Sequence, residues 1–306
     1  MFVTVNICTW NRADLLRQAL ECMTRLHVPE GVEWELLLVN NNCTDHTDLV
    51  AAEFAERLPL KLMHEPTPGK SFALNRAVAE ARGELMLFTD DDALVEPDWL
   101  QQYVREASSR PEAMYFGGPV EPWFVVEPPE WLKRHLKRLA GVYAIRPRTD
   151  STVEIADESL VPYGVNMAIR TATLRQHPFD VRLGPSGKSE VRGEELDLFA
   201  RLKAAGCSGV WLGCNAVRHY IPQQRITAGY IYEFWRGFGV SEARGAGVGG
   251  RVPWWAFRAW CESSLCRCFW SPWKNDAWLR SLILAARAHG AIWEWQRLRR
   301  SGDLNG

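Results

Sequence analysis

Short apolar runs alternate with helix-like segments through the first third of the chain. Residues 2–8 alternate in polarity and are rich in β-forming side chains, which predicts a strand. Leucine, alanine and methionine then recur at helical spacing over residues 15–23. Further strands are expected at 34–39, 60–64 and 85–88, with helices at 46–57 and 71–81. Strands that alternate with helices predict a mainly parallel α/β sheet, whose polar turns meet at one edge.

The regular pattern weakens after a fifth expected strand at 114–120. Several prolines interrupt residues 121–157, which indicates an insertion. A strand at 163–170, a helix from Gly193 and a short strand at 210–212 then extend the α/β pattern. Residues 251–306 differ, because they hold eight of the fifteen tryptophans. We therefore expect an α/β domain over residues 1–250 and an amphipathic, Trp-rich helical extension over 251–306.

The extension contains two apolar stripes at helical spacing. The first comprises Trp254, Phe257, Cys261, Leu265 and Cys268. The second comprises Trp278, Leu282, Ala285, His289, Ile292 and Trp293, with Arg280, Arg287 and Glu294 opposite. Two interpretations stay open: helices that pack on the α/β domain or a second subunit, so that an oligomer is possible, and helices that lie in a membrane interface. We favour the membrane.

Residues 131–139 place four cations among leucines at helical spacing. This pattern is typical of a solvated amphipathic helix, and equally of a surface that faces anionic lipid or phosphate. The formal net charge of the whole chain is -1, so we expect no nucleic-acid partner.

The composition favours a folded protein in a reducing compartment. With 306 residues, 47% of them hydrophobic, the chain can bury a substantial core. The eight cysteines show no CxxC spacing, and the amino terminus lacks the pattern of a signal peptide. No apolar run approaches the length of about 18 residues expected of a membrane-spanning helix. We expect a cytoplasmic protein, with peripheral attachment at the inner face of the cell membrane open to it.

Three consecutive acids, Asp90, Asp91 and Asp92, follow the apolar run at 85–88 after a single threonine, Thr89. Open α/β sheets bind ligands at the carboxyl ends of their strands, and carboxylates suit Mg2+ or Mn2+ that carries phosphates. A solvated turn is the alternative, because Pro97 and Trp99 indicate that a helix begins soon afterwards.

Three other polar turns are expected at the same edge of the sheet. They are residues 9–12, residues 40–45 and the pair Gly69 and Lys70, which together supply amides, a carboxylate and cations. Each alone is an ordinary turn. Combined with the three acids, they predict a nucleotide site.

These motifs, in this order, resemble those of the family 2 glycosyltransferases of the GT-A fold, over about residues 2–240. The resemblance implies a Rossmann-like, mainly parallel sheet flanked by helices. It also implies nucleotide contacts from Thr9, Asn11, Arg12, Asn40, Asn42, Asp45, Lys70, Asn75, Asp90, Asp91 and Arg225. Asn40 replaces the family's aspartate, which accepts the uracil N3–H; an amide oxygen accepts this bond without charge. The identity of the nucleotide therefore stays open.

The resemblance further implies which residues bind a metal ion, which lie beside the sugar, and which residue is the catalytic base. A metal ion, Mn2+ or Mg2+, would be held by Asp92 with help from Asp90 and His219. Gly164 and Asn166 would lie beside the donor sugar or the acceptor, and residues 183–193 look like a loop that closes over the donor. The segment from Gly193 matches a family motif in which Glu195 takes the place of the catalytic aspartate.

Glu194 is the reserve candidate for that base. Acids in the first turn of a helix are also expected simply because they offset the helix dipole. A lone histidine such as His219 is more often structural than a ligand.

The resemblance implies an inverting, metal-dependent glycosyltransferase of the hexosyltransferase class. It would move a sugar from a nucleotide-diphosphate sugar, with a UDP-sugar favoured, to a hydroxyl of a saccharide, a polyprenyl-linked saccharide or a protein. Glu195 would remove the acceptor proton in a single displacement, which inverts the anomeric carbon. Two alternatives stay open: a sugar nucleotidyltransferase, whose first turn should be glycine-rich, and a catalytically silent scaffold that binds membranes.

Overall fold

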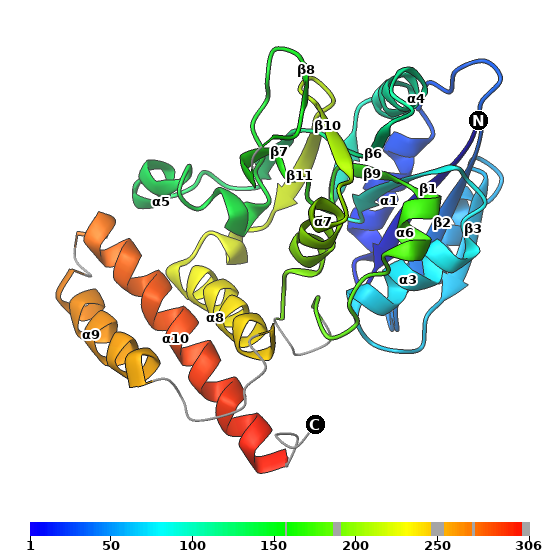
Figure 1. Ribbon diagram of the computed structural model, residues 1–306. Coiled ribbons are helices and arrows are strands. Elements are labelled where there is room, and N and C mark those ends of the chain that lie inside the picture. The colour runs from blue at the N-terminus through cyan, green and yellow to red at the C-terminus, as the bar shows by residue number, and fades with distance from the viewer. Residues whose placement is uncertain (157, 186–190, 246–253, 271–272, 302–306) are drawn as a thin grey trace. The chain divides into compact units, whose positions relative to one another are not determined.

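The structure is a computed structural model that describes residues 1–156, 158–185, 191–245, 254–270 and 273–301 (Figure 1). It divides into two compact units. The first comprises Met1–Trp123, Tyr143–Arg182 and Glu194–Tyr220. The second comprises Phe124–Val142, Leu183–Gly193 and Ile221–Gly306. The predicted domain boundary at residue 250 and the insertion at 121–157 stay predictions.

The first unit is built on an eight-stranded sheet with the order β3-β2-β1-β4-β9-β6-β10-β8. Its strands are β1 (Phe2–Thr9), β2 (Glu33–Asn40), β3 (Leu60–His64), β4 (Leu85–Asp90), β6 (Ala113–Gly117), β8 (Thr152–Glu154), β9 (Met167–Arg170) and β10 (Ser208–Leu212). The neighbouring pairs among β1 to β4 are parallel, while β9 runs antiparallel to β4 and β6. Strand β8 pairs antiparallel with β10 at the edge. The predicted mainly parallel sheet is confirmed.

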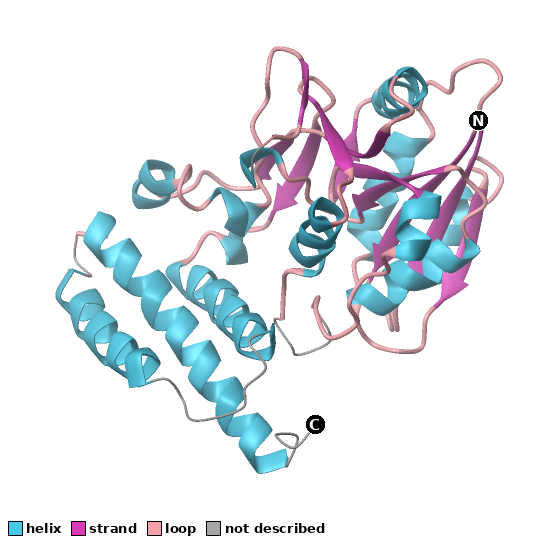
Figure 2. Cartoon of the chain, viewed as in Figure 1, coloured by secondary structure: helices cyan, strands magenta, loops and turns pink. Residues whose placement is uncertain are grey.

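Apolar side chains cover both faces of this sheet, which explains the continuous apolar runs in the sequence. In β4, Leu85 and Leu87 belong to one buried cluster, while Met86 and Phe88 belong to another. Full burial of such a side chain contributes roughly 1.5–3 kcal/mol. The strands are thus held between two helical layers, as Figure 2 shows.

Six helices form those layers. They are α1 (Ala13–Met23), α2 (Thr47–Phe54), α3 (Lys70–Glu80), α4 (Trp99–Ser109), α6 (Thr171–Gln176) and α7 (Glu194–Ala204). Residues of α1, α2 and α4 pack in one buried cluster, and residues of α3, α6 and α7 in the other. Helices α1, α2 and α3 each follow one parallel strand and precede the next, so all three begin at the edge where the polar turns lie. The start of α7 lies near the start of α3, because Lys70 pairs with Glu195.

The fifth predicted strand, 114–120, was wrong as a single element. Strand β6 ends at Gly117, and Val120 opens β7 (Val120–Phe124) in a second sheet with the order β5-β11-β7. The other two members are β5 (Ala93–Val95) and β11 (Val217–Ile221). Pro119 has no N–H to continue a ladder, and a Cβ on Gly118 would lie 2.4 Å from the Asn215 carbonyl oxygen. The chain therefore changes sheets at this point.

Three long helices dominate the second unit: α8 (Ala228–Gly245), α9 (Trp254–Trp270) and α10 (Asp276–Ser301). Helix α10 packs against both others (Figure 1). It meets α8 at two glycines, because a Cβ on Gly239 would lie 2.0 Å from the Arg287 carbonyl oxygen and one on Gly290 1.9 Å from that of Arg236. The two helix backbones therefore approach too closely for any side chain at either glycine.

The first stripe of the extension is exposed in part: Phe257 is 57% and Leu265 73% exposed, while Ala256 and Ser263 are buried. One prediction for α10 was wrong, because Glu294, predicted on its outer face, is fully buried and accepts hydrogen bonds from Arg244 and Arg297. The reason is that α10 has helices on two sides. The side chains of Trp254 and Cys268, also predicted in the first stripe, lie outside the described residues.

The predicted helix at 131–139 is shorter than expected. Helix α5 spans Glu130–His135, and a series of turns follows. Its leucines at 132 and 139 are nevertheless buried, and the four cations are exposed. The shorter elements are η1 (Ala140–Tyr143), η2 (Glu158–Leu160) and η3 (Gln223–Arg225). Among the described helices, none is both long and apolar enough to cross a membrane.

Candidate active site

The parallel strands bring the predicted polar turns together. Thr9 at the end of β1 lies directly opposite Asn40 at the end of β2, and Cys8 lies opposite Asp90 at the end of β4. The three strands therefore end side by side. Each is followed by one of the turns that the sequence singled out.

Arg12 forms the first of two carboxylate clusters. Its Nη1 atom lies 3.0 Å from Oδ1 of Asp91 and 2.8 Å from Oδ2 of Asp92. Asp91 also accepts a hydrogen bond of 2.7 Å from the Thr9 hydroxyl. Burial raises the pKa of Asp91 to about 6, although Arg12 acts in the opposite direction. Asp91, which was predicted as a nucleotide contact, thus ties the first turn to the acids.

His219 faces the second oxygen of Asp92. Its Nε2 lies 3.4 Å from Oδ1 of Asp92, and its Nδ1 lies 3.0 Å from the Tyr143 carbonyl oxygen. A carbonyl only accepts hydrogen bonds, so Nδ1 carries a proton. In the neutral ring, Nε2 then presents its lone pair to a carboxylate, an arrangement that a proton or a metal ion stabilises.

Lys70 forms the second cluster, at the first residue of α3. Its Nζ lies 3.3 Å from Oδ1 of Asp90, 3.3 Å from Oε1 of Glu195 and 3.9 Å from Oε1 of Glu194. The two glutamates begin α7, and the ammonium group joins them to the carboxyl end of β4. The structure thus brings together Asp90, Lys70, Glu194 and Glu195, from segments far apart in the sequence.

The two glutamates have opposite pKa shifts. Burial raises the pKa of Glu194 to about 8, and the neighbouring Glu195 carboxylate adds to this. Burial acts on Glu195 in the same direction, but the Lys70 charge and several hydrogen bonds hold the pKa of Glu195 below its ordinary value. At neutral pH, Glu194 is therefore mainly protonated and Glu195 is ionised. An ionised carboxylate beside a neutral one can accept a proton.

Gly164 leaves the space that Glu195 occupies. A Cβ at this position would lie 2.5 Å from Oε1 of Glu195 and 3.4 Å from Nζ of Lys70. A side chain at position 164 would therefore displace the Glu195 carboxylate from its present place. Its predicted contact with a sugar or acceptor stays a prediction.

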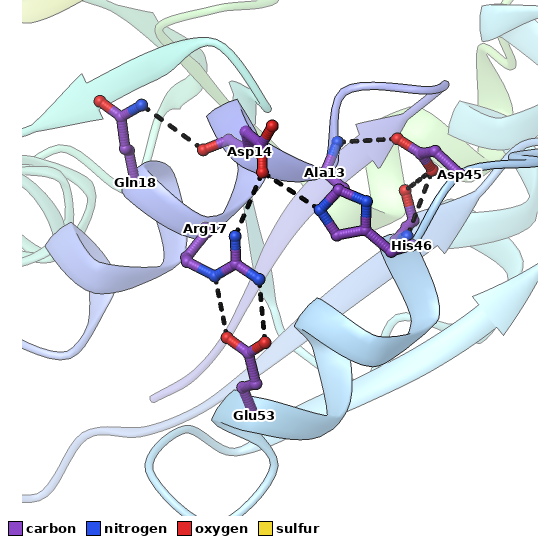
Figure 3. A network of polar contacts seen from close by, with 8 residues as sticks. Ala13, Asp14, Arg17, Gln18, Asp45, His46 and Glu53 are labelled. Carbon is purple, nitrogen blue, oxygen red and sulfur yellow. Dashed lines mark hydrogen bonds and ion pairs between the residues drawn. The ribbon is translucent and has the colours of Figure 1, made fainter.

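The predicted nucleotide residues of the first two turns bond to each other. Asn11, whose φ is 53°, accepts a hydrogen bond of 2.6 Å from the Thr44 N–H. Asp45 accepts a hydrogen bond of 2.9 Å from the Ala13 N–H, and so joins the second turn to the start of α1 (Figure 3). Beside it, Arg17 of α1 bonds to Glu53 of α2 through two nitrogens (Figure 3). Direct nucleotide contacts from Asn11 and Asp45 stay predictions.

The asparagines after β2 join the second and third turns. Asn41, which the sequence analysis did not select, donates to the Glu65 and Thr67 carbonyls and accepts from the Gly69 N–H. Asn42, with φ 64°, also donates to the Glu65 carbonyl. Both side chains therefore set the position of the loop that leads to Lys70.

Asn40 is held by two polar partners. Its Oδ1 accepts a hydrogen bond of 2.7 Å from the Cys43 N–H, and its Nδ2 donates one of 2.7 Å to Asp48. Cys43 also accepts a hydrogen bond of 3.2 Å from the Asn11 N–H, and its thiol donates 3.4 Å to the Thr9 carbonyl. Asp48 and Cys43 were missed because neither a carboxylate in a helix nor a single cysteine stands out in sequence.

Three other predicted residues have structural contacts. Asn75 of α3 both donates to and accepts from the backbone of Phe179. Asn166 is fully buried, where Oδ1 accepts from Trp99 and Tyr103 and Nδ2 donates to two carbonyls. Its contact with a sugar stays a prediction that these bonds argue against. Arg225 belongs to the second unit, with its guanidinium 5.9 Å from the Tyr230 ring centroid; its predicted diphosphate contact is untested. In the predicted closing loop, residues 186–190 lie outside the described residues.

The donor chemistry at Asp92 and His219 fits a divalent metal ion. Carboxylate oxygen and imidazole nitrogen are both ligands of Mn2+, and Nδ1 of His219 already has the backbone partner that orients a ligating ring. In the described part of the chain, no three His, Cys, Asp or Glu side chains by themselves make up a metal shell. Asp90, the third predicted ligand, lies 3.3 Å from Lys70 instead.

Together, the fold and these clusters define a class of protein. A mainly parallel sheet with acids, amides and cations at its carboxyl edge, and a lysine-paired glutamate beside them, is suited to binding a charged, nucleotide-like ligand and removing a proton. The profile of Glycosyl transferase family 2 matches residues 4–176. The chain belongs to this family and is a glycosyltransferase, which confirms the resemblance inferred from the motifs and favours sugar transfer over the two alternatives.

Curated relatives and solved structures agree with this assignment. The succinoglycan biosynthesis protein ExoM of Rhizobium meliloti is 23% identical, over 76% of this chain and 71% of that protein. The glucosyl-dolichyl phosphate glucuronosyltransferase of Haloferax volcanii is 24% identical, over 78% of this chain and 76% of that protein.

Two solved structures show the same fold. The mannosyltransferase PcManGT from Pyrobaculum calidifontis, in complex with GDP-Man and Mn2+, matches with a TM-score of 0.57 and 20% identity, over 99% of this chain and 75% of that one. S. aureus TarS, in complex with UDP, matches with a TM-score of 0.56 and 15% identity, over 99% of this chain and 92% of that one. The GT-A fold predicted from the motifs is confirmed.

Proposed function

We propose that the protein is an inverting glycosyltransferase that uses a nucleotide-diphosphate sugar and Glu195 as general base. One observation carries the proposal: the carboxylate of Glu195, in the first turn of α7, lies 3.3 Å from Lys70 and beside Gly164, with only 14% of the side chain exposed. The carboxylate would accept the proton of the acceptor hydroxyl as that oxygen attacks the anomeric carbon. A single displacement of this kind inverts the configuration.

The residues of the first cluster would hold a divalent ion. Asp92 and His219 supply the ligands, with Asp90 as a further candidate, and the ion would offset the charge on the leaving diphosphate. Mn2+ and Mg2+ both suit these donors, and the PcManGT complex contains Mn2+.

We favour a UDP-sugar as donor, and the relatives support more than one nucleotide. TarS is solved with UDP, whereas PcManGT is solved with GDP-Man. Asn40, in the place of the family's uracil-binding aspartate, already uses its amide on Cys43 and Asp48. For the acceptor we propose a saccharide, a polyprenyl-linked saccharide or a protein, and the dolichyl-phosphate relative favours the lipid-linked class.

The first experiment is a donor screen with purified protein. UDP- and GDP-sugars would be incubated with Mn2+, with Mg2+ or with a chelator, and the released nucleotide measured. We expect one donor to be hydrolysed, and we expect this hydrolysis to stop when the metal is chelated. When acceptor is present, nucleotide release should fall strongly in Glu195→Gln. Metal-independent turnover would remove the assignment of Asp92 and His219, and an unchanged rate in the Glu195 variant would remove the base.

We also infer that the second unit binds the interface of an anionic membrane. On α9, Phe257 and Trp260 are exposed with their ring centroids 6.1 Å apart, and Leu265 is 73% exposed; Trp293 on α10 is 45% exposed. Aromatic side chains favour the headgroup region, and each cation near anionic lipid adds about 1 kcal/mol. Exposed cations are present at residues 133, 134, 137 and 138 and at the end of α10.

Vesicle flotation tests this inference. Wild-type protein should float with vesicles of phosphatidylglycerol and phosphatidylcholine, but weakly with phosphatidylcholine alone. The triple substitution of Phe257, Trp260 and Leu265 by serine should abolish flotation without changing the circular dichroism spectrum. Light scattering that gives twice the mass of 34.9 kDa for wild type, and the monomer mass for the variant, would identify the same face as a subunit interface instead.

A further inference from the structure

One guanidinium nitrogen of Arg12 bridges two acids of the carboxylate run. Nη1 lies 3.0 Å from Asp91 and 2.8 Å from Asp92, both of which are buried. The Arg12 side chain itself is 39% exposed and belongs to the residue that precedes α1. Part of the Arg12 side chain therefore reaches solvent while its Nη1 holds the two buried acids.

Asp92 has both carboxylate oxygens engaged within the first unit. Oδ2 accepts from Arg12, and Oδ1 faces His219 at 3.4 Å. A divalent ion of the size of Mg2+ requires an oxygen at about 2.0–2.1 Å. Such an ion on Asp92 would lie within a few ångströms of the guanidinium, where two cations repel each other strongly in a partly buried site. Arg12 and a divalent ion therefore compete for the same carboxylate.

Lys70 does not take part in this competition. Its charge lies beside Asp90 and the two glutamates of α7, at 3.3 Å from both Asp90 and Glu195. Movement of Lys70 would thus expose Asp90 and the base, and would leave Arg12 on Asp92. The two cations hold different carboxylates.

We propose that Arg12 is an internal competitor of the metal ion at Asp92, released when the diphosphate of the nucleotide offers the guanidinium another partner. The proposal rests on the proposed function, because it takes Asp92 as a metal ligand. The planar fork of arginine matches phosphate oxygens well, so the exchange replaces one charge-assisted pair with another. Metal alone then binds weakly, nucleotide strengthens metal binding, and the metal strengthens nucleotide binding by the same factor.

The test measures Mn2+ binding by electron paramagnetic resonance of the free ion, first without nucleotide and then with UDP. It needs no assay of activity. Arg12→Gln is expected to bind Mn2+ more tightly than wild type, by a factor in the range of about 5 to 150 that is typical of coupled sites. The further gain in Mn2+ affinity on addition of UDP should be smaller in Arg12→Gln than in wild type. Arg17→Gln is the matched control, because this guanidinium pairs with Glu53 and the charge change is equal. It should bind Mn2+ as wild type does.

Equal or weaker Mn2+ binding by Arg12→Gln overturns the proposal. If that variant does not fold, Arg12→Met takes its place: it removes the charge and keeps an apolar stem, so it should bind Mn2+ more tightly than wild type, and no gain again overturns the proposal. Asp92→Asn separates this failure from failure of the proposed function. If it binds Mn2+ with UDP as tightly as wild type, Asp92 is not the ligand and both proposals fall. If it loses binding while Arg12→Gln gains nothing, only the role of Arg12 falls.

Discussion

The two carboxylate clusters at the carboxyl edge of the sheet are built from the same parts and differ in their cation. Arg12 bridges Asp91 and Asp92 with a guanidinium that reaches solvent, whereas Lys70 lies among Asp90, Glu194 and Glu195 with only 21% of its side chain exposed. A forked, accessible cation is easily exchanged for another ligand, while a buried point charge sets the pKa of its neighbours. One cluster is therefore suited to binding and the other to proton transfer.

The largest effect is expected when Glu195, the proposed general base of the proton-transfer cluster, is replaced. Glu195→Gln should lower kcat by about 100- to 10,000-fold, because the amide cannot accept the acceptor's proton. Donor binding, measured by calorimetry with the nucleotide sugar, should change little. Glu194→Gln is the matched variant, and its loss should be much smaller because Glu194 is already mainly protonated at neutral pH, with a pKa of about 8. A larger loss in Glu194→Gln would exchange the two roles.

The next effect concerns the binding cluster. Asp92→Asn should weaken Mn2+ binding in the presence of UDP by more than about tenfold, because an amide oxygen carries no charge for the metal. Calorimetric titration of Mn2+ into the UDP-saturated protein measures this. Asp14→Asn changes the charge equally on an exposed residue of α1 and should leave Mn2+ affinity unchanged. Equal losses in both variants would indicate a general charge effect and no specific site.

A smaller effect tests how Lys70 controls the base. The Lys70 charge contributes to holding the pKa of Glu195 below its ordinary value, so Lys70→Met should raise that pKa. The acidic limb of the kcat profile should then move to higher pH, because the base stays protonated further up the scale. A pH profile at saturating donor shows the shift. If the limb stays where it is in wild type while KM for the donor rises, Lys70 acts on the donor alone.

The smallest effect is on stability. The pKa of Glu194 is about 8 in the folded protein and ordinarily 4.5, so the folded state binds the extra proton between these values and stability falls as pH rises through them. Glu194→Gln should remove this slope, which amounts to a few kcal/mol at most. Urea unfolding at pH 5, 6.5 and 8 measures it. Asp91, with a pKa of about 6, adds a similar fall in stability with pH below about pH 6, and this fall should persist in Glu194→Gln. If stability still falls with pH above pH 6 in Glu194→Gln as it does in wild type, the raised pKa does not belong to Glu194.

Much of the fold was predictable because it depends on local patterns. The runs that became β2 and β4 are apolar on both faces, β1 alternates between apolar and polar side chains, and the helices between these strands repeat at helical spacing. The direction of β9 was not predictable, since an apolar strand reads the same in either direction. The break after Gly117 was missed because the collision that requires glycine at 118 comes from Asn215, far along the chain.

The candidate site was predictable as a set of residues and less so as a set of roles. The motifs identified Arg12, Lys70, Asp92 and Glu195, all of which belong to the two clusters. They did not indicate that Arg12 would contact acids some 80 positions away, a contact that depends on tertiary structure. In the extension, α9 is apolar on several sides, and composition alone does not determine which side packs against α10.

Cys43 lies where the first two polar turns meet at the carboxyl edge of the sheet. Its sulfur accepts from Asn11 and donates to Thr9, so the first two turns meet at one atom, and burial raises the pKa of this thiol. The Cys43 thiol should react slowly with an alkylating reagent while the two turns are in contact, because the added group would have to force them apart. The rate of that modification, followed by mass spectrometry, would report how tightly the turns close, with no substrate turned over.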